Sequence, residues 1–304
     1  ATGESKSGQD RFLEEMERVQ AEAKRKTPEE LVMIYKGIPY PSCICSEETF
    51  CALESLEARE DDLLIVTYPK CGKTLFLGLT CPLTAQSPLS MLWNHLSYER
   101  MIYCSLLIQN VKLNQEPSPR IFSTHLQYDY LPKSVSAGNV KILAVFRNPK
   151  DTAVSFYHFY NNNPGLPSYS SWDTFLQDFI SGNVSFGSYF DYAITWNKHI
   201  DDENVLILTF EEMKEDLYKA VKKISTFFGF SLTEEQVQYI SDKGTFKSMK
   251  EKSVDNIYVK PLNMHDKAFM CFASFEGDVG DWKNHFSEAQ SKEMDAKFEA
   301  CLAG

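Results

Sequence analysis

The sequence predicts an α/β fold with a central parallel sheet flanked by helices. Three apolar runs, at residues 63–66, 140–146 and 205–209, have the near-continuous hydrophobicity of strands that are buried on both faces. The first run leads into a tight turn and a helix start, and the second leads into a helical pattern at residues 152–160. A length of 304 residues and a hydrophobic content of 43% allow one large α/β domain or two small ones.

The N-terminal part predicts helices. Residues 1–36 have the pattern of a polar leader followed by a helix, whose apolar stripe comprises Phe12, Met16, Val19 and Ala23. The Gly-Ile-Pro-Tyr-Pro segment that starts at Gly37 ends this helix. Residues 46–59 predict a second helix with Ser46 as its N-cap.

The first apolar run ends in a candidate anion site. Pro69 and Gly72 punctuate a tight turn, and a helix is expected to begin at Thr74. A loop between a buried strand and a helix N-terminus presents unpaired N–H groups and the positive end of the helix dipole, which favours phosphate. Lys70 and Lys73 add positive charge. The alternative is an ordinary strand–turn–helix with two solvated lysines.

The motif Gly-Lys-Thr at residues 72–74 partly matches a nucleotide-binding P-loop. The first glycine of that pattern would fall at Thr67, so the match is incomplete. A P-loop kinase is therefore an alternative function, and it would need a Mg²⁺-binding aspartate at a strand end. A phosphatase loop that begins at Cys71 is excluded, because Leu77 occupies the position of its arginine.

The later elements bring further polar motifs to the sheet. Residues 120–126 predict a short strand that ends in a polar turn with His125, and Arg147 follows the second apolar run. Pro149 suits the first turn of the next helix, in which Ser155 lies. Ligands of open α/β sheets bind at the carboxyl ends of strands, so these motifs are expected at one rim. Helices are also expected to begin at Ser171-Trp172 and at Ser188.

The composition limits the partners. A net charge of −11 argues against nucleic acid or an anionic membrane as the main partner. No apolar run approaches the ~20 residues that span a bilayer, and the charged N-terminus lacks a signal-peptide core. The eight cysteines have no metal-site spacing and are typical of reduced thiols, which predicts a cytoplasmic protein.

Two motifs resemble those of the cytosolic sulfotransferases, which use 3′-phosphoadenosine 5′-phosphosulfate (PAPS). Residues 67–74 are similar to their Thr-Tyr-Pro-Lys-x-Gly-x-Thr phosphosulfate loop, and residues 147–158 to their Arg-Asn-Pro-Lys-Asp-x-x-x-Ser-x-Tyr-His segment. Residues 37–41 and 301–304 resemble the 6B branch. The resemblance implies a leader and helix at 1–34 and a single sulfotransferase domain at 35–304. It also implies sulfuryl transfer from PAPS, without a metal, to the hydroxyl of a small lipophilic phenol or alcohol.

The resemblance assigns roles to individual residues. His125 matches the general base, and Lys70 would stabilise the charge that develops during transfer. Arg147 and Ser155 match the residues that bind the 3′-phosphate of PAPS. The other cofactor-binding residues that it implies are Cys71, Gly72, Lys73, Thr74, Leu75, Phe210, Gly244, Thr245, Phe246 and Gly277. A core phenylalanine is the alternative for Phe246.

Several positions depart from the family pattern. Ser123 replaces a lysine, Leu75 replaces a tryptophan, and Phe275-Glu276 replace an Arg-Lys pair that clasps the 3′-phosphate. These departures predict weakened cofactor binding, and they favour an alternative function as a catalytically weak nucleotide-binding protein of the same fold. The segment that resembles the family's dimer contact is altered between residues 283 and 292, which leaves a homodimer open. Residues 78–115 have no clear period, so the acceptor cannot be identified.

A thiol at a helix N-terminus beside two lysines is expected to have a lowered pKa. One interpretation of Cys71 is a reactive thiol that bound cofactor protects. The favoured interpretation is a buried, inert residue in place of the serine that the family usually has.

Overall fold

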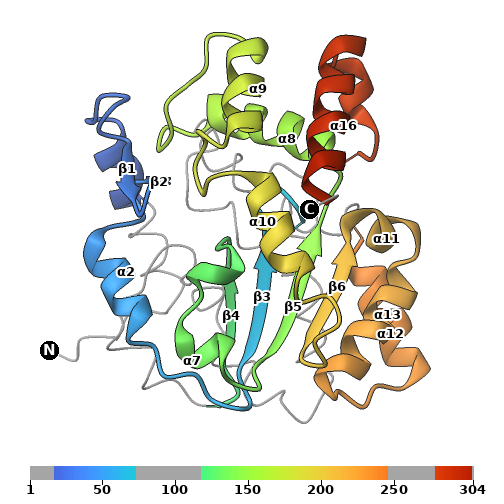
Figure 1. Cartoon of the computed structure of the whole chain (residues 1–304). Helices are drawn as coiled ribbons and strands as arrows, with labels where there is room; N and C mark the ends of the chain where they lie inside the picture. The colour runs from blue at the N-terminus through green and yellow to red at the C-terminus, as the bar shows by residue number, and fades with distance from the viewer. Residues whose placement is uncertain (1–16, 73–117, 246–277, 303–304) are drawn as a thin grey trace, which may run out of the picture.

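In the part of the chain that the structure describes, the central sheet has four parallel strands. The structure, a computed structural model, describes residues 17–72, 118–245 and 278–302. Within these ranges the strands are β3 (Leu63–Thr67), β4 (Ile121–Thr124), β5 (Lys141–Phe146) and β6 (Val205–Thr209), in the order β4-β3-β5-β6 (Figure 1). The expected α/β fold and all three predicted apolar strands are confirmed.

The register of the sheet brings the carboxyl ends of the strands to one rim. Leu63 pairs with Ile121 on β4 and with Lys141 on β5, so the three parallel strands start side by side and run without an offset. The chain passes from β3 outward to β4 and then returns across β3 to β5. The strand order therefore reverses between β3 and β5, and a ligand crevice is expected outside that point.

Helices cover both faces of the sheet. Alternate residues of the buried strands belong to two apolar clusters, one containing Leu64 and Val66, the other Leu63 and Ile65. The first cluster packs under the helices α2 (Glu47–Glu54), α7 (Lys133–Ser136), α8 (Pro149–Asn162), α9 (Trp172–Ser181) and α10 (Tyr189–Asn197). The second packs under α11 (Phe210–Glu215), α12 (Leu217–Phe228) and α13 (Glu234–Lys243).

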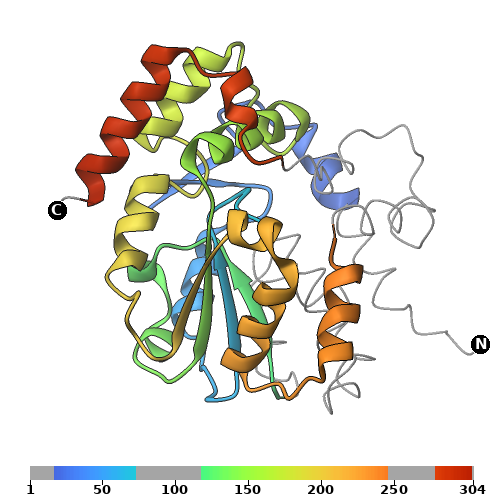
Figure 2. The same ribbon diagram turned by 90° about the vertical axis from the view of Figure 1, so that its right-hand side faces the viewer.

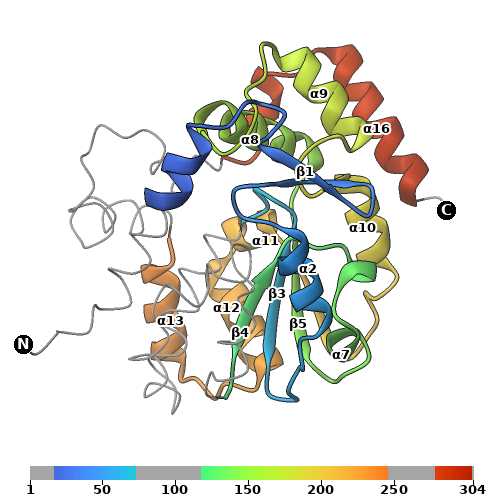
Figure 3. The same ribbon diagram turned by 90° about the vertical axis from the view of Figure 1, so that its left-hand side faces the viewer.

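The figures show this layering. In Figure 2, α7 and α10 lie on one side of the strands and α12 and α13 on the other. In Figure 3, α2 lies in front of the strands, and its Phe50 belongs to the first cluster. The long C-terminal helix α16 (Glu288–Leu302) lies with α8 and α9 beyond the carboxyl ends of the strands. No helix of the described ranges is long and apolar enough to cross a membrane.

The N-terminal part differs from the prediction. The helix expected up to residue 36 does not extend that far, because β1 (Val32–Tyr35) and β2 (Ile38–Pro41) form an antiparallel hairpin. Lys36 and Gly37 make its two-residue turn with φ of 49° and 80°, the left-handed pair that closes tight hairpins. The β-branched and aromatic residues of β1 suit a strand. The domain boundary expected at 34/35 falls inside this strand.

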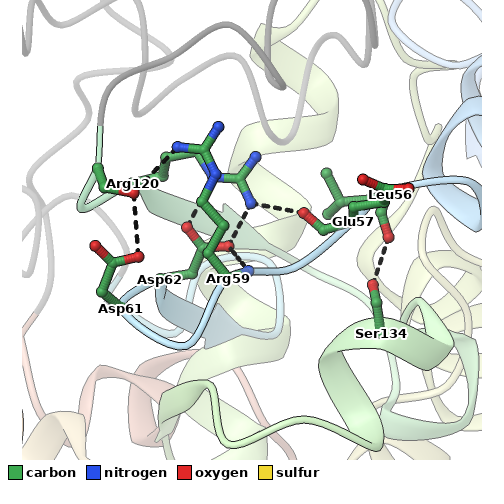
Figure 4. Close-up of polar contacts among 8 residues, drawn as sticks. Leu56, Glu57, Arg59, Asp61, Asp62, Arg120 and Ser134 are labelled. Atoms are coloured by element: carbon green, nitrogen blue, oxygen red, sulfur yellow. Dashed lines mark hydrogen bonds and ion pairs between the residues drawn. The ribbon is translucent and has the colours of Figure 1, made fainter.

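The helix expected at residues 46–59 also ends early, at Glu54. Ser46 is its N-cap as predicted, accepting from the N–H of Thr49. The carbonyls that follow the helix have other partners: Ser134 donates to the oxygen of Leu56, and Arg120 Nη2 donates to that of Glu57 at 2.8 Å (Figure 4). These bonds hold the chain in an extended path toward β3.

A buried ion pair lies at the amino-end rim of the sheet. Arg120 Nε and Nη2 lie 2.7 and 2.5 Å from the carboxylate oxygens of Asp62, and both side chains are nearly inaccessible to solvent (Figure 4). Asp62 also accepts the N–H of Arg59 at 2.7 Å. The pair joins the starts of β3 and β4, on the side of the sheet opposite the predicted ligand rim.

Candidate active site

The loop that follows β3 is held in one conformation by its own backbone and by Tyr68. Lys70 and Gly72 have φ of 69° and 105°, so the chain bends twice through left-handed conformations. Tyr68 is fully buried, and its hydroxyl donates to the carbonyl of Gly187 at 2.7 Å. The loop is therefore anchored to the core by an aromatic side chain.

The predicted binding residues Lys73, Thr74, Leu75, Phe246 and Gly277 lie outside the described ranges.

Arg147 follows β5 and reaches across to this loop. Its guanidinium is 5% exposed, and Nη1 donates to the carbonyl of Lys70 at 3.0 Å. Tyr189 fixes the backbone by donating to the carbonyl of Arg147 at 2.5 Å. Within the described ranges the buried Nε of Arg147 has no hydrogen-bond partner. A buried, unpaired guanidinium donor is costly unless an anion accepts from it, so this group fits the phosphate that the motif predicts.

Phe210 closes the other side of the loop. Its ring centroid lies 4.5 Å from the guanidinium carbon of Arg147, and the ring is 2% exposed. A Cβ at Gly72 would lie only 2.8 Å from Phe210 Cδ2. Glycine is thus required at position 72 both for its positive φ and for the close approach of this ring. Phe210 therefore joins β6 to the loop and to Arg147.

Lys214 is a cation of this region that the motifs did not single out. Its ammonium lies 5.9 Å from the Phe210 ring centroid. Burial lowers the pKa of Lys214, and the charge of Arg147 acts in the same direction against the opposing effect of Asp278. The sequence contained a signal for it, because residues 210–214 resemble a Tyr-Glu-Asp-Met-Lys segment of the cytosolic sulfotransferases, which ends in this lysine.

His125 lies beside the start of the same loop. The pairing of Val66 with Thr124 places the next residues, Thr67 and His125, side by side. His125 Nδ1 lies 2.7 Å from the Thr67 carbonyl oxygen, and this oxygen can only accept, so we assign the ring proton to Nδ1. Nε2 then carries the lone pair. The edge of Phe186 packs against the ring with a centroid distance of 5.0 Å.

A largely apolar cavity of about 60 Å³ adjoins His125. It lies between the hairpin, α2 and β4, and its walls include Tyr40, Phe50, Phe122 and Phe186. Its polar lining comes from residues such as Thr49 and Thr124. The cavity therefore offers space for apolar groups next to the candidate base.

The structure contradicts a reactive Cys71 and agrees with the favoured interpretation of a buried, inert residue. The thiol is fully buried, with Sγ 3.5 Å from Thr152 Oγ1, and burial raises its pKa to about 12. The side chain points into the core, where the thiolate is disfavoured. Lys70 instead places its ammonium 4.8 Å from the ring centroid of Phe159.

The remaining predicted residues lie on α8 and at the end of α13. Ser155 is half-buried on α8, one turn after Asp151 and hence on the same helix face. Gly244 is the C-cap of α13, and its N–H donates to Ile240 O at 2.8 Å. Thr245 Oγ1 donates to the carbonyl of Asp242. These bonds fix the helix end and do not join it to Arg147.

The start of α8 also holds the C-terminal segment. Asn148 is the N-cap, and Pro149 lies in the first helical turn, where it was predicted. The buried carboxylate of Asp151 accepts the N–H groups of Gly280 and Trp282 at 2.8 and 3.0 Å. The motif contained this aspartate, but the sequence alone did not show which segment it would bind.

Comparison with known protein families shows to which family this arrangement belongs. A family model described as "Sulfotransferase domain" matches residues 60–304, which include β3, its loop, β5 and α16. This chain belongs to the sulfotransferase family. The recognition from sequence is thus confirmed, and the fold around the loop and Arg147 is that of a sulfotransferase.

Curated relatives match this sulfotransferase over nearly its whole length. Sulfotransferase 6B1 of Mus musculus is 44% identical over 97% of this chain and 93% of its own length, and the Homo sapiens protein has the same values. Sulfotransferase 2B1 of Mus musculus is 34% identical over 89% of this chain and 80% of the relative. The resemblance to the 6B branch is therefore confirmed.

Solved structures agree with the fold. Mouse sulfotransferase SULT7A1 complexed with PAP is 33% identical, with a TM-score of 0.74, and the match covers 90% of this chain and 94% of that one. Retinol dehydratase in a complex with retinol and PAP has a TM-score of 0.70 at 18% identity, covering 93% and 94% of the two chains. The second similarity concerns the fold alone.

Proposed function

We propose that this sulfotransferase transfers the sulfuryl group of PAPS to the hydroxyl of a small lipophilic phenol or alcohol, with His125 as the general base. One observation carries the proposal: His125 and Arg147 are both bonded to the backbone of the β3 terminus and its loop, at Thr67 O and Lys70 O. A proton acceptor and a phosphate site on one loop are what this transfer needs. The solved relative SULT7A1 holds PAP, the product that PAPS leaves.

The residues of this chain divide the chemistry between them. PAPS supplies an activated sulfuryl group on its 5′-phosphate. His125 Nε2 removes the acceptor hydroxyl proton as that oxygen forms its bond to sulfur and the bond from sulfur to the phosphate oxygen breaks. Lys70 stabilises the negative charge left on that phosphate. Arg147, with its buried Nε, and Ser155 hold the distant 3′-phosphate and so position the reacting end.

The cavity beside His125 supports an apolar acceptor. Its aromatic walls bury apolar surface of an acceptor, which is favourable by about 25 cal/mol per Å².

The described cysteines are free thiols, which supports the proposal that the enzyme acts in the cytoplasm.

A second candidate is a catalytically weak nucleotide-binding protein of the same fold. The observation that favours it is Ser123, which is 1% exposed on β4 at the position where the family carries a lysine. A buried serine supplies no positive charge to the transfer. Membership of the sulfotransferase family, in contrast, leaves the P-loop kinase without support.

Titration with PAP and with ATP, combined with a transfer assay, tests the proposal. We expect PAP to bind without Mg²⁺, ATP to bind more weakly, and a simple phenol to accept sulfate from PAPS. The variant Arg147→Ala should weaken PAP binding. The matched control is Arg59→Ala, which removes a guanidinium bonded to Ser118 at the opposite rim and should leave binding unchanged. PAP binding without any transfer would favour the second candidate, and ATP hydrolysis with Mg²⁺ would overturn both.

A further inference from the structure

The buried carboxylate of Asp151 binds a segment that is distant in the sequence, which its place in α8 alone does not require. The side chain is 2% exposed, and each oxygen accepts one backbone N–H from the C-terminal segment: Oδ2 from Gly280 and Oδ1 from Trp282. These N–H groups frame the start of the short 3₁₀ helix η2 (Asp281–Asn284), where such donors lack partners within the helix. Asp151 therefore fixes both the position and the direction of this turn.

The neighbouring Lys150 holds a second point of the same segment. Its ammonium is buried, lies 2.7 Å from Asp295 Oδ2 and 2.8 Å from Ser291 Oγ on α16, and lies 4.3 Å from the ring centroid of Trp282. Two successive residues of α8 thus attach the 3₁₀ turn and the C-terminal helix. The segment from residue 278 onward is docked on the first turn of α8.

The docked segment also reaches the anion site. The carbonyl oxygen of Asp278 lies 3.5 Å from Arg147 Nη2, two residues before the N–H that Asp151 accepts. Ser155 lies on the face of α8 that carries Asp151. Arg147 therefore contacts the segment that Asp151 holds, and Ser155 shares the helix face of Asp151.

We propose that Asp151 is a positioning residue that couples the docking of residues 278–302 to cofactor binding at Arg147 and Ser155. The inference rests on the proposed function, because it takes Arg147 as the ligand of the 3′-phosphate. Coupling of this kind is reciprocal: if the docked segment favours the phosphate, the bound phosphate favours the docked segment by the same factor. The coupling then passes through the contact between Asp278 and Arg147.

The variant Asp151→Asn tests the coupling with little change of shape. The amide oxygen can accept from only one of the two N–H groups, and the amide NH₂ would face the other. We expect the PAP dissociation constant and the KM for PAPS to rise by about fivefold or more. The kcat and the acceptor KM should stay within about twofold, since the base and the cavity are untouched. In the unchanged enzyme PAP should slow hydrogen exchange at Gly280 and Trp282, and the variant should lose this effect.

The matched control is Asp173→Asn. Asp173 is exposed on α9 and accepts from Gln290 of α16 at 2.7 Å, so the change also removes the charge of a carboxylate that contacts the C-terminal helix, but at a distance from Arg147. We expect normal PAP binding from it. Equal weakening in both variants would overturn the proposal in favour of a purely structural role, as would PAP binding in Asp151→Asn that matches the unchanged enzyme.

Two further comparisons keep the result interpretable. If Arg147→Ala binds PAP as well as the unchanged enzyme does, the proposed function itself fails. If Arg147→Ala weakens binding and Asp151→Asn does not, only the coupling fails. Should Asp151→Asn not fold, Gly280→Ala replaces it: Gly280 has a φ of 91° and open space around its Cβ, so the change strains the turn without a clash. Weaker PAP binding by this variant supports the coupling, and unchanged binding overturns it.

Discussion

The Nδ1 atom of His125 lies 2.7 Å from the carbonyl oxygen of Thr67, the last residue of β3. The two residues are 58 positions apart, and only the parallel register of β3 and β4 brings them together. A backbone carbonyl cannot give a proton, so this contact orients the ring and leaves Nε2 as its proton acceptor. Because Thr67 leads directly into the loop after β3, the proposed base and this loop share one support.

Replacing the base should abolish most of the turnover. His125→Ala is expected to lower kcat by ~10²–10⁴, the usual contribution of a positioned general base, while PAP binding changes little. His199→Ala is the control, because this partly exposed histidine stacks on Tyr128 and pairs with Asp202 away from the loop. Near-normal turnover of His125→Ala with the same acceptor would remove His125 from the mechanism.

The close approach of Phe210 to the loop predicts a difference between two glycines. Gly72→Ala and Gly37→Ala each place a side chain at positive φ, at a cost of about 1–2 kcal/mol. Only the first meets a neighbour, Phe210 at 2.8 Å, whereas nothing lies within 4 Å of a Cβ at Gly37. We expect Gly72→Ala to weaken PAP binding about tenfold or more, because the loop must shift. Calorimetric titration that finds equal affinities for the two variants would contradict this.

The buried thiol of Cys71 should be inert. With a pKa raised to about 12 by burial, only about one thiol in ten thousand is ionised at pH 8. Among the cysteines of the described ranges, we expect iodoacetamide to label the exposed Cys51 first and to leave Cys71 unmodified in the folded protein, as read by peptide mass spectrometry. Cys51→Ser should leave Cys71 equally unmodified. Rapid labelling of Cys71 that PAP prevents would restore the reactive-thiol hypothesis.

Breaking the ion pair at the amino-end rim should destabilise the fold. Arg120→Met leaves the Asp62 carboxylate buried, which costs ~3–5 kcal/mol of unfolding free energy in denaturant titrations. The double change with Asp62→Leu should recover much of this loss. Lys222→Met, which removes an exposed pair with Glu234, should cost at most about 1 kcal/mol. A loss from Arg120→Met as small as that control would argue against an intact buried pair.

The sequence also predicts a gain of affinity. Phe275→Arg with Glu276→Lys restores the Arg-Lys pair of the family, and each charge-assisted hydrogen bond is worth ~1.5–3 kcal/mol. We expect PAP binding to tighten about tenfold, and the gain to shrink at high salt because the charges are screened. Ile200→Arg with Glu203→Lys gives the same change of charge at an exposed remote site. Equal gains from both pairs would show a nonspecific effect of charge.

The fold was largely predictable because its signals are local. Buried parallel strands read as apolar runs, and helix starts are marked by capping side chains, so Ser46, Ser171 and Ser188 were placed correctly. The β1–β2 hairpin was missed. Its strands have only four residues each, and its turn uses Lys36 at a positive φ, which the residue type does not announce.

The sequence predicted which residues of the candidate site gather at one rim of the sheet. It did not predict the contacts between them. Chain order and strand ends suffice to bring His125 and Arg147 to the carboxyl ends of the sheet. The direction of a side chain depends on tertiary packing, which is why the sequence alone left both a reactive and a buried Cys71 open. The bonds from Asp151 to Gly280 and Trp282 join segments that share no local pattern.

The interleaved strand order has a consequence for how the protein is made. The loop after β3, Arg147 after β5 and Phe210 after β6 come together only when strands distant in the chain have paired, and Asp278 reaches Arg147 from a segment later in the sequence. A growing chain therefore has no complete candidate site until residue 278 has been added. Nucleotide that binds only the finished site selects the complete fold and stabilises it by mass action. In the cell, the nucleotide supply would then influence not only how fast the enzyme works but how much of it survives.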